Sequence, residues 1–128
     1  MAQGTRICSP ANRKLTERYE ENMTGEQFVK LCYDEKEAIL SEYFRDGSQT
    51  IVAEKLRSLF EKGIEKDELY ELLNLVLNEN YYTLLLGLDG EAALGNVQNA
   101  YKLYDEDGNL LNECGEIEEA AYRYFMEK

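Results

Sequence analysis

The chain has 128 residues, 44% of them hydrophobic, so it is long enough for one domain with its own core and too short for two. Its 26 acidic and 14 basic residues give a net charge of −12, which disfavours direct binding to nucleic acid or to an anionic membrane. Histidine is absent, which excludes Ser-His and Cys-His nucleophile pairs, the usual proton shuttle at neutral pH and most zinc sites.

Signals for membranes and for disulfide bonds are also missing from the sequence. The longest strongly apolar stretch, YYTLLLGL at 81–88, is less than half of the roughly 20 residues that cross a bilayer. The N-terminal MAQGTRICSPANRK has no apolar segment of the kind found in a secretory signal. The cysteines, Cys8, Cys32 and Cys114, are odd in number and too widely spaced for a Cys-x-x-Cys motif. We therefore expect a single cytoplasmic domain over residues 1–128.

The N-terminal region is predicted to contain one thin amphipathic helix. Residues 1–9 have no periodic pattern and are expected to be a flexible end. Pro10 suits the first turn of a helix, and Leu15, Tyr19 and Met23 follow at fourfold spacing on one side of it.

Two further helices follow. Thr24 and Gln27 form a capping box ahead of a helical apolar stripe that runs to Phe44. The turn sequence RDGS ends this helix, and Ser48 is the predicted N-cap of the next one. Gly63 is expected to end that helix as the residue that follows its C-cap.

The strongest periodic signal predicts a central, buried helix over 66–86. Its apolar residues recur at helical spacing, and the half near YYTLLLG is apolar nearly all round, which is typical of a helix buried on most sides. Gly87 is expected to end it. The glycines of GLDGEAALGN (87–96) match neither known phosphate-binding pattern, and two acids among them would repel phosphate, so we interpret this stretch as a structural loop.

The segment YDEDGNLLNECGE (104–116) allows two interpretations. It resembles the calcium loop of the EF-hand family, with the ligand positions falling on Asp105, Asp107, Asn109, Glu113 and Glu116. That likeness implies calcium binding, but position 6 is Leu110, where the family needs glycine for a sharp turn. The other interpretation is a β-hairpin at about 97–113, because aromatic and β-branched residues flank an Asp-Gly turn. We favour the hairpin.

These elements predict an α+β, mainly helical fold. About four N-terminal helices pack around the central helix (66–86), followed by the hairpin and a C-terminal helix (116–127) with Ile117, Ala121, Tyr124 and Phe125 towards the core. The hairpin must lie against the helices, since a lone hairpin is only marginally stable. The predicted core consists of Phe28, Leu31, Ile39, Val52, Leu56, Leu73, Val76, Leu77, Leu84, Leu85 and Phe125.

Catalysis has little support in the sequence. With 26 acids, some carboxylate pair always has the separation that glycoside hydrolysis needs, and there is no tryptophan to stack on a sugar. A helical two-metal carboxylate site usually requires Glu-x-x-His, which a chain without histidine cannot supply. We expect no enzymatic activity, no cofactor and no bound metal.

Charge asymmetry favours a binding function. Residues 1–66 hold 11 basic and 12 acidic residues, whereas residues 67–128 hold 3 and 14. A small acidic chain without catalytic motifs resembles, as a class, the immunity and antitoxin proteins that neutralise basic bacterial toxins, often nucleases. The resemblance implies that carboxylates and tyrosines near the C-terminus cover the cationic surface of a basic protein. The predicted contacts are Tyr104, Asp105, Asp107, Glu113, Glu116, Glu118, Glu119 and Tyr122. The alternative is a calcium-binding protein with the degenerate EF-hand-like loop at 105–116.

Overall fold

The structure, a computed structural model, describes residues 22–127. Its elements in chain order are α2 (Gly25–Tyr43), α3 (Ile51–Glu61), α4 (Lys66–Leu88), the 3-10 turn η2 (Glu113–Gly115), α5 (Glu116–Ala121) and its π-helical continuation η3 (Tyr122–Met126). The expected flexible end (1–9) and the helix predicted to begin near Pro10 lie outside the described residues.

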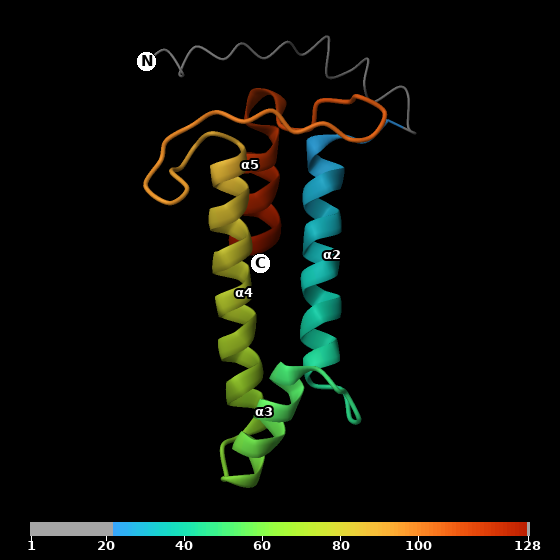
Figure 1. The fold of residues 1–128 in the computed structure, drawn as a ribbon, viewed down its shortest axis with the longest axis vertical. Coiled ribbons are helices and arrows are strands. Elements are labelled where there is room, and N and C mark those ends of the chain that lie inside the picture. Colours follow the sequence, from blue (N-terminus) through green and yellow to red (C-terminus); the bar gives the residue numbers. More distant parts are fainter. Residues whose placement is uncertain (1–21, 128) are drawn as a thin grey trace.

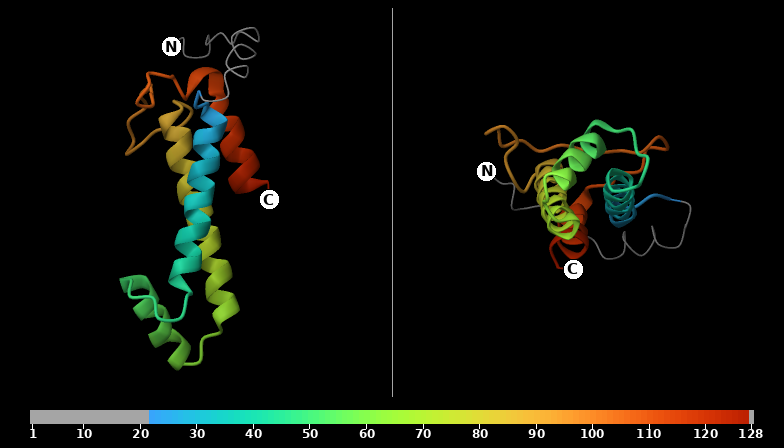
Figure 2. Two further views of the ribbon diagram at one scale, coloured as in Figure 1. Left: turned by 90° about the vertical axis from the view of Figure 1, so that its right-hand side faces the viewer. Right: turned by 90° about the horizontal axis from the view of Figure 1, so that it is seen from below.

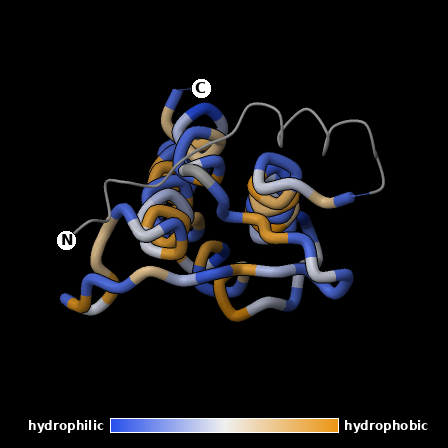
Figure 3. Tube along the Cα trace, turned by 90° about the horizontal axis from the view of Figure 1, so that it is seen from above, coloured by the Kyte–Doolittle hydropathy of each residue, from blue (hydrophilic) through white to orange (hydrophobic). Residues whose placement is uncertain are grey.

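Two long helices form the frame of the molecule (Figure 1). α2 and α4 lie side by side and run in opposite directions, with α3 at one end. At the other end, residues 89–112 cross the helix tips, and α5 with η3 packs against one face of the α2–α4 pair (Figure 2). We call these the α3 end and the loop end. Viewed from the loop end, the crossing segment carries both hydrophobic and hydrophilic stretches (Figure 3).

The helix starts follow local capping chemistry. The Thr24 hydroxyl accepts a hydrogen bond from the Gln27 backbone N–H (3.1 Å), and the Gln27 side chain accepts one from the Thr24 N–H (3.0 Å), which confirms the predicted capping box. The N-cap of α3 is Thr50 and not Ser48 as predicted; Ser48 is fully buried beside it. Gly63 has φ +95° and follows the C-cap of α3, as predicted.

The central helix is longer and less buried than predicted. α4 continues through Gly87, where a Cβ atom would lie 2.5 Å from the Leu94 side chain, so the glycine allows the following loop to pack against the helix instead of ending it. Leu31, Val76 and Leu84 are 53%, 42% and 50% exposed, so these three core assignments are wrong. For Val76 and Leu84 the expectation of burial failed because α5 covers only one side of α4, near its C-terminal half.

The core lies at the loop end, where α2, α4 and α5 meet. Its buried members are Val29, Leu85, Ile117, Ala120, Ala121 and Phe125. The predictions for Leu85 and Phe125 are confirmed, as is that for Leu56, which is buried on α3. The Phe125 ring stacks on Tyr81 at a centroid distance of 5.4 Å and meets Tyr33 edge-on at 5.5 Å. These contacts attach the C-terminal helix to both long helices.

Residues 97–113 form no strand, so the predicted β-hairpin and the α+β class are wrong; the predominantly helical character is right. The Asp-Gly turn itself is present, with Gly108 at φ +86° and an isolated antiparallel bridge between Tyr104 and Leu110. The pairing stops there because the flanking chain finds its hydrogen-bond partners elsewhere.

Asn112 supplies those partners. Its side-chain oxygen accepts a hydrogen bond from the Leu103 N–H (3.0 Å), and its amide donates to the carbonyls of Tyr101 (2.7 Å) and Leu88 (2.9 Å). One buried amide therefore replaces a strand ladder and ties the crossing loop to the end of α4. The crossing loop also packs closely against the first residue of α2, because a Cβ atom on Gly25 would clash with the Leu111 carbonyl oxygen.

Candidate functional site

The loop end concentrates the negative charge of the described chain. Residues 89–119 contain one basic residue, Lys102, and nine acidic residues: Asp89, Glu91, Asp105, Glu106, Asp107, Glu113, Glu116, Glu118 and Glu119. The chain gathers them at one end because it crosses the helix tips after α4 and turns back into α5 (Figure 1). At the α3 end, residues 44–66 contain four acidic and five basic residues. Charge is therefore polarised along the long axis of the molecule.

Part of this acidic concentration stabilises the fold. α2 and α5 both begin at the loop end, so their partly positive N-termini favour carboxylates there. Glu116 Oε2 accepts a hydrogen bond from the Glu26 N–H of α2 (3.2 Å). Asp89 Oδ2 accepts one from the Glu118 N–H of α5 (2.9 Å), and Asp89 is only 1% exposed. These two carboxylates cap helices in the way that an N-cap side chain does.

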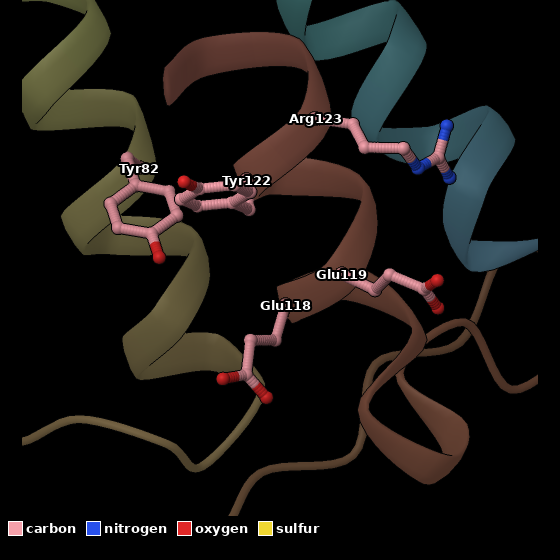
Figure 4. Close-up of a pocket in the computed structure, with 5 residues that line it drawn as sticks. All are labelled: Tyr82, Glu118, Glu119, Tyr122 and Arg123. Carbon is pink, nitrogen blue, oxygen red and sulfur yellow. The ribbon is translucent and has the colours of Figure 1, made fainter. Parts of the chain in front are cut away.

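A shallow hollow of about 340 Å³ lies between α4 and the C-terminal helix (Figure 4). It is lined by Tyr82, Glu118, Glu119, Tyr122 and Arg123. The rings of Tyr82 and Tyr122 meet edge-on with centroids 6.4 Å apart. Burial, and then the neighbouring charge of Glu118, raise the pKa of Tyr82 above its ordinary value. The hollow thus combines two aromatic surfaces with two carboxylates.

Arg123 is the single basic side chain that lines this hollow. Its guanidinium lies 3.4 Å from Glu26 Oε2 on α2 and 6.0 Å from the centroid of the Tyr124 ring. The side chain extends towards α2 and away from the Tyr82–Tyr122 pair (Figure 4). Its charge is therefore directed at Glu26, and the aromatic side of the hollow keeps a negative character.

The structure divides the eight predicted contact residues into three groups. Three of them, Glu118, Glu119 and Tyr122, line the hollow. Tyr104, Asp107 and Glu113 are exposed on the crossing loop and the turn that follows it. The remaining two, Asp105 and Glu116, use their carboxylates inside the fold.

Asp105 forms the turn. Its Oδ1 accepts hydrogen bonds from the backbone N–H groups of Asp107 (3.0 Å) and Asn109 (2.8 Å), and its Oδ2 accepts one from the Asn109 side chain (2.9 Å). The Asn109 side chain is also the main reason that the pKa of Asp105 is lowered. The first and last ligand positions of the EF-hand-like pattern, Asp105 and Glu116, are therefore engaged with different parts of the backbone.

Among the described residues, the carboxylates that converge are those of Asp89, Glu91 and Glu118. One oxygen of each lies within 4.8 Å of the others, and oxygen ligands of this kind suit hard divalent cations. None of the three belongs to the 105–116 loop. Sequence reasoning missed this grouping, as it missed Tyr82, because the residues meet only through the packing of α5 against the end of α4.

Comparison with known protein families, with curated proteins and with solved structures finds no match to this chain. Within residues 22–127, no helix has the length and apolar character needed to cross a membrane.

Proposed function

We propose that the loop end binds a basic protein and that the chain acts as an immunity- or antitoxin-type inhibitor that covers the partner's cationic surface. The observation that carries this proposal is the charge distribution, with nine acidic residues and one basic residue between positions 89 and 119. A potential of one sign at one end of an elongated molecule attracts and orients a partner of opposite sign.

Exposed tyrosines lie at the same end and supply contact area. Tyr101, Tyr104 and Tyr122 are 37%, 54% and 51% exposed. Tyrosine is enriched at protein interfaces because it offers a large, stiff surface together with a hydroxyl that hydrogen-bonds. The loop carboxylates would accelerate the encounter, and the tyrosines would exclude water once the partner is bound.

The hollow suits a cationic side chain of the partner, and an arginine fits it best. The edge-on rings of Tyr82 and Tyr122 offer aromatic surface to a guanidinium, while Glu118 supplies the charge beside them. An arginine inserted there would lose its contact with nucleic acid, which is how an inhibitor of this class would block a nuclease.

The experiment tests whether any basic protein encoded by a neighbouring gene binds this chain, and measures the association over a series of salt concentrations. The on-rate should fall steeply as salt rises, because exposed charges are screened. The variant Asp107→Asn/Glu113→Gln/Glu119→Gln should lower the on-rate about tenfold or more at low salt. Its control removes the same number of exposed acids from the α3 end, as Asp46→Asn/Glu54→Gln/Glu61→Gln, and should change the on-rate far less. Salt-independent binding, or equal effects of the two variants, would contradict the proposal.

Calcium binding is the alternative that the sequence raised, and a melting experiment separates it from partner binding. A rise in melting temperature with millimolar Ca²⁺ that Asp105→Asn abolishes would favour the 105–116 loop. The variant Glu91→Gln changes an exposed side chain and reports instead on the converging group of Asp89, Glu91 and Glu118. No shift with Ca²⁺ would exclude the alternative.

A further inference from the structure

The sequence before α2 carries the opposite charge to the loop end. Residues 1–16 are the longest stretch of the chain without an acid, and residues 1–18 contain one acid, Glu17. The basic residues of this stretch are Arg6, Arg13, Lys14 and Arg18. Residues 89–119, in contrast, hold nine acidic residues and one basic residue. The chain therefore contains a basic segment that complements its own acidic end.

This basic segment joins α2 close to the hollow between α4 and the C-terminal helix. Arg123 lines the hollow, and its guanidinium lies 3.4 Å from Glu26 Oε2 in the first turn of α2. Glu116 Oε2 accepts a hydrogen bond from the Glu26 N–H, which holds the starts of the two helices together. One arginine side chain thus spans the distance from the hollow to the point where the preceding segment enters α2.

The basic residues nearest to α2 have enough chain to reach the hollow. Arg18 is six residues before the N-cap Thr24, and Lys14 is ten residues before it. Backbones of these lengths span up to about 20 Å and about 33 Å. Both spans exceed the length of the arginine side chain that already connects the hollow with α2.

The pattern of the segment also matches the chemistry of the hollow. In the helix predicted from Pro10, Leu15 and Tyr19 lie one turn apart, and Lys14 and Arg18 lie beside them at the same spacing. One side of the segment therefore offers apolar surface together with two positive charges. Its acids are placed elsewhere: Glu17 is on the opposite side from Leu15, and the other two directly precede α2, whose N-terminus favours negative charge.

The hollow provides partners for both kinds of side chain. The rings of Tyr82 and Tyr122 form its α4 side, and Glu119 lies on its α2 side (Figure 4). Glu119 is exposed, and in the part of the chain that the structure describes it pairs with no basic side chain. Arg123 does not oppose an incoming cation strongly, because its own charge is directed at Glu26.

We propose that residues 13–18 bind to this hollow when no partner is present. The segment enters from α2, so Arg18 reaches Glu119 first, and Lys14 lies further on, over the Tyr82–Tyr122 pair. A guanidinium binds a carboxylate with paired hydrogen bonds, and an ammonium is attracted to tyrosine rings. Covalent attachment favours this occupant over any separate molecule, since a short connection gives an effective concentration of about a millimolar.

The docked segment regulates the binding site, a consequence that rests on the proposed function. It takes the place of the partner's arginine, so the partner binds only the fraction of molecules in which the segment has left the hollow. The on-rate for a basic partner should then be higher for Arg18→Glu than for Lys55→Glu, which makes the same charge change at an exposed position on α3. Equal on-rates would contradict the competition.

Zero-length cross-linking with a carbodiimide tests the docking on the chain alone. It joins an amine to a carboxylate in direct contact, and peptide mass spectrometry of the monomer fraction should find Lys14 joined to Glu118 or Glu119. The ion pair of Lys30 with Asp34, at 2.8 Å, is the internal standard for the reaction. Lys55 should give no product with either glutamate, because it is at the α3 end. A Lys30–Asp34 product without any Lys14 product would overturn the proposal.

A charge exchange tests the predicted order of contacts. Arg18→Glu should lower the yield of the Lys14 product about threefold or more, and adding Glu119→Arg to the same chain should restore most of it. Lys55→Glu is the matched control and should leave the yield nearly unchanged. A further loss in the double variant, or equal effects of Arg18→Glu and Lys55→Glu, would overturn the arrangement. Circular dichroism confirms that each variant keeps its helices.

The cross-linking experiment contains no partner, so its failure would remove the docked segment and leave the inhibitor function standing. A basic protein that fails to bind would contradict the inhibitor function and leave the cross-link in place.

Discussion

The Asn112 side chain makes hydrogen bonds that backbone groups of a facing strand would make in a sheet. It is 8% exposed and makes three hydrogen bonds, to Leu103, Tyr101 and Leu88, which bring together two parts of the crossing loop and the last turn of α4. An asparagine amide suits this place because it can accept and donate at once. A side chain without polar atoms would leave all three backbone groups without these bonds in a partly buried position.

We therefore expect Asn112→Leu to lower the free energy of unfolding by about 2–4 kcal/mol, since three partly buried backbone groups lose their partners. Urea denaturation measures this change, and hydrogen exchange should show faster exchange in residues 97–112 than in α2. The control is Asn99→Leu, which replaces an exposed asparagine of the same loop and should change stability by less than about 0.5 kcal/mol. Equal losses from both variants would show that the three bonds contribute nothing.

Glu42 has a strongly lowered pKa of about 2 near the end of α2. The cause is first the paired hydrogen bonds from Arg45 (2.8 and 2.9 Å) and then the Ser48 hydroxyl. A carboxyl whose pKa is lower in the folded state stabilises the fold above its unfolded pKa of about 4.3, and this contribution is lost as pH falls towards 2. NMR titration of the Glu42 carboxyl should give a midpoint near 2 in the wild type and a higher midpoint, towards 4.3, in Arg45→Gln. A wild-type midpoint near 4 would contradict this account.

At the scale of elements, a buried lysine joins the two long helices. Lys36 of α2 is 1% exposed; its ammonium lies 2.7 Å from both Asn74 Oδ1 of α4 and Glu37 Oε2, and 4.7 Å from the centroid of the Tyr33 ring. A buried cation with these partners fixes how α2 and α4 are aligned, although apolar side chains of similar size can be equally stable there.

Substitutions at this contact should show whether Lys36 stabilises the fold or only sets the alignment of α2 and α4. Lys36→Ala should lower the free energy of unfolding by about 2–4 kcal/mol, because it leaves a cavity and an amide without its donor. Lys36→Met combined with Asn74→Leu should stay within about 1 kcal/mol of the wild type in urea denaturation. A double variant as unstable as Lys36→Ala would mean that the ion contact itself stabilises the helix pair.

The helices could be predicted from the sequence, because capping and periodicity are local. The capping box at Thr24, the glycine after α3 and the start of α4 were all predicted correctly. Which side chains are buried was harder to predict. Lys36 stands among charged residues in DEKE, and only its spacing from Val29 and Leu40 places it on the inner stripe of α2. The predicted hairpin did not form for a tertiary reason: backbone pairing across the turn is limited to the Tyr104–Leu110 bridge, and beyond it the backbone bonds the Asn112 side chain instead of a facing strand.

At the scale of the whole molecule, the sequence showed that the C-terminal half is acidic but not where its acids lie. Residues 67–88 form most of α4, which runs from the α3 end to the loop end, so their acids are spread along the molecule. The crossing loop that follows is what concentrates acidic residues at one end. Glu118, Glu119 and Tyr122 could be predicted together because they share one helix. Tyr82 could not be joined to them, since it is some 40 positions earlier and reaches the hollow only through the packing of α4 on the C-terminal helix.

Concentrating charge at one end has a cost in stability that a substitution can measure. Glu106 is exposed on the crossing loop, and Glu106→Lys should raise the melting temperature by about 2 °C at low salt, because it relieves repulsion among the loop carboxylates. The gain should shrink as salt is added. Glu35→Lys makes the same change at an exposed position in the middle of α2 and should have a smaller effect. If the loop end binds a basic protein, Glu106→Lys should also slow association, so the variant that is more stable should be the weaker inhibitor. A gain in stability with an unchanged on-rate would place the binding surface elsewhere.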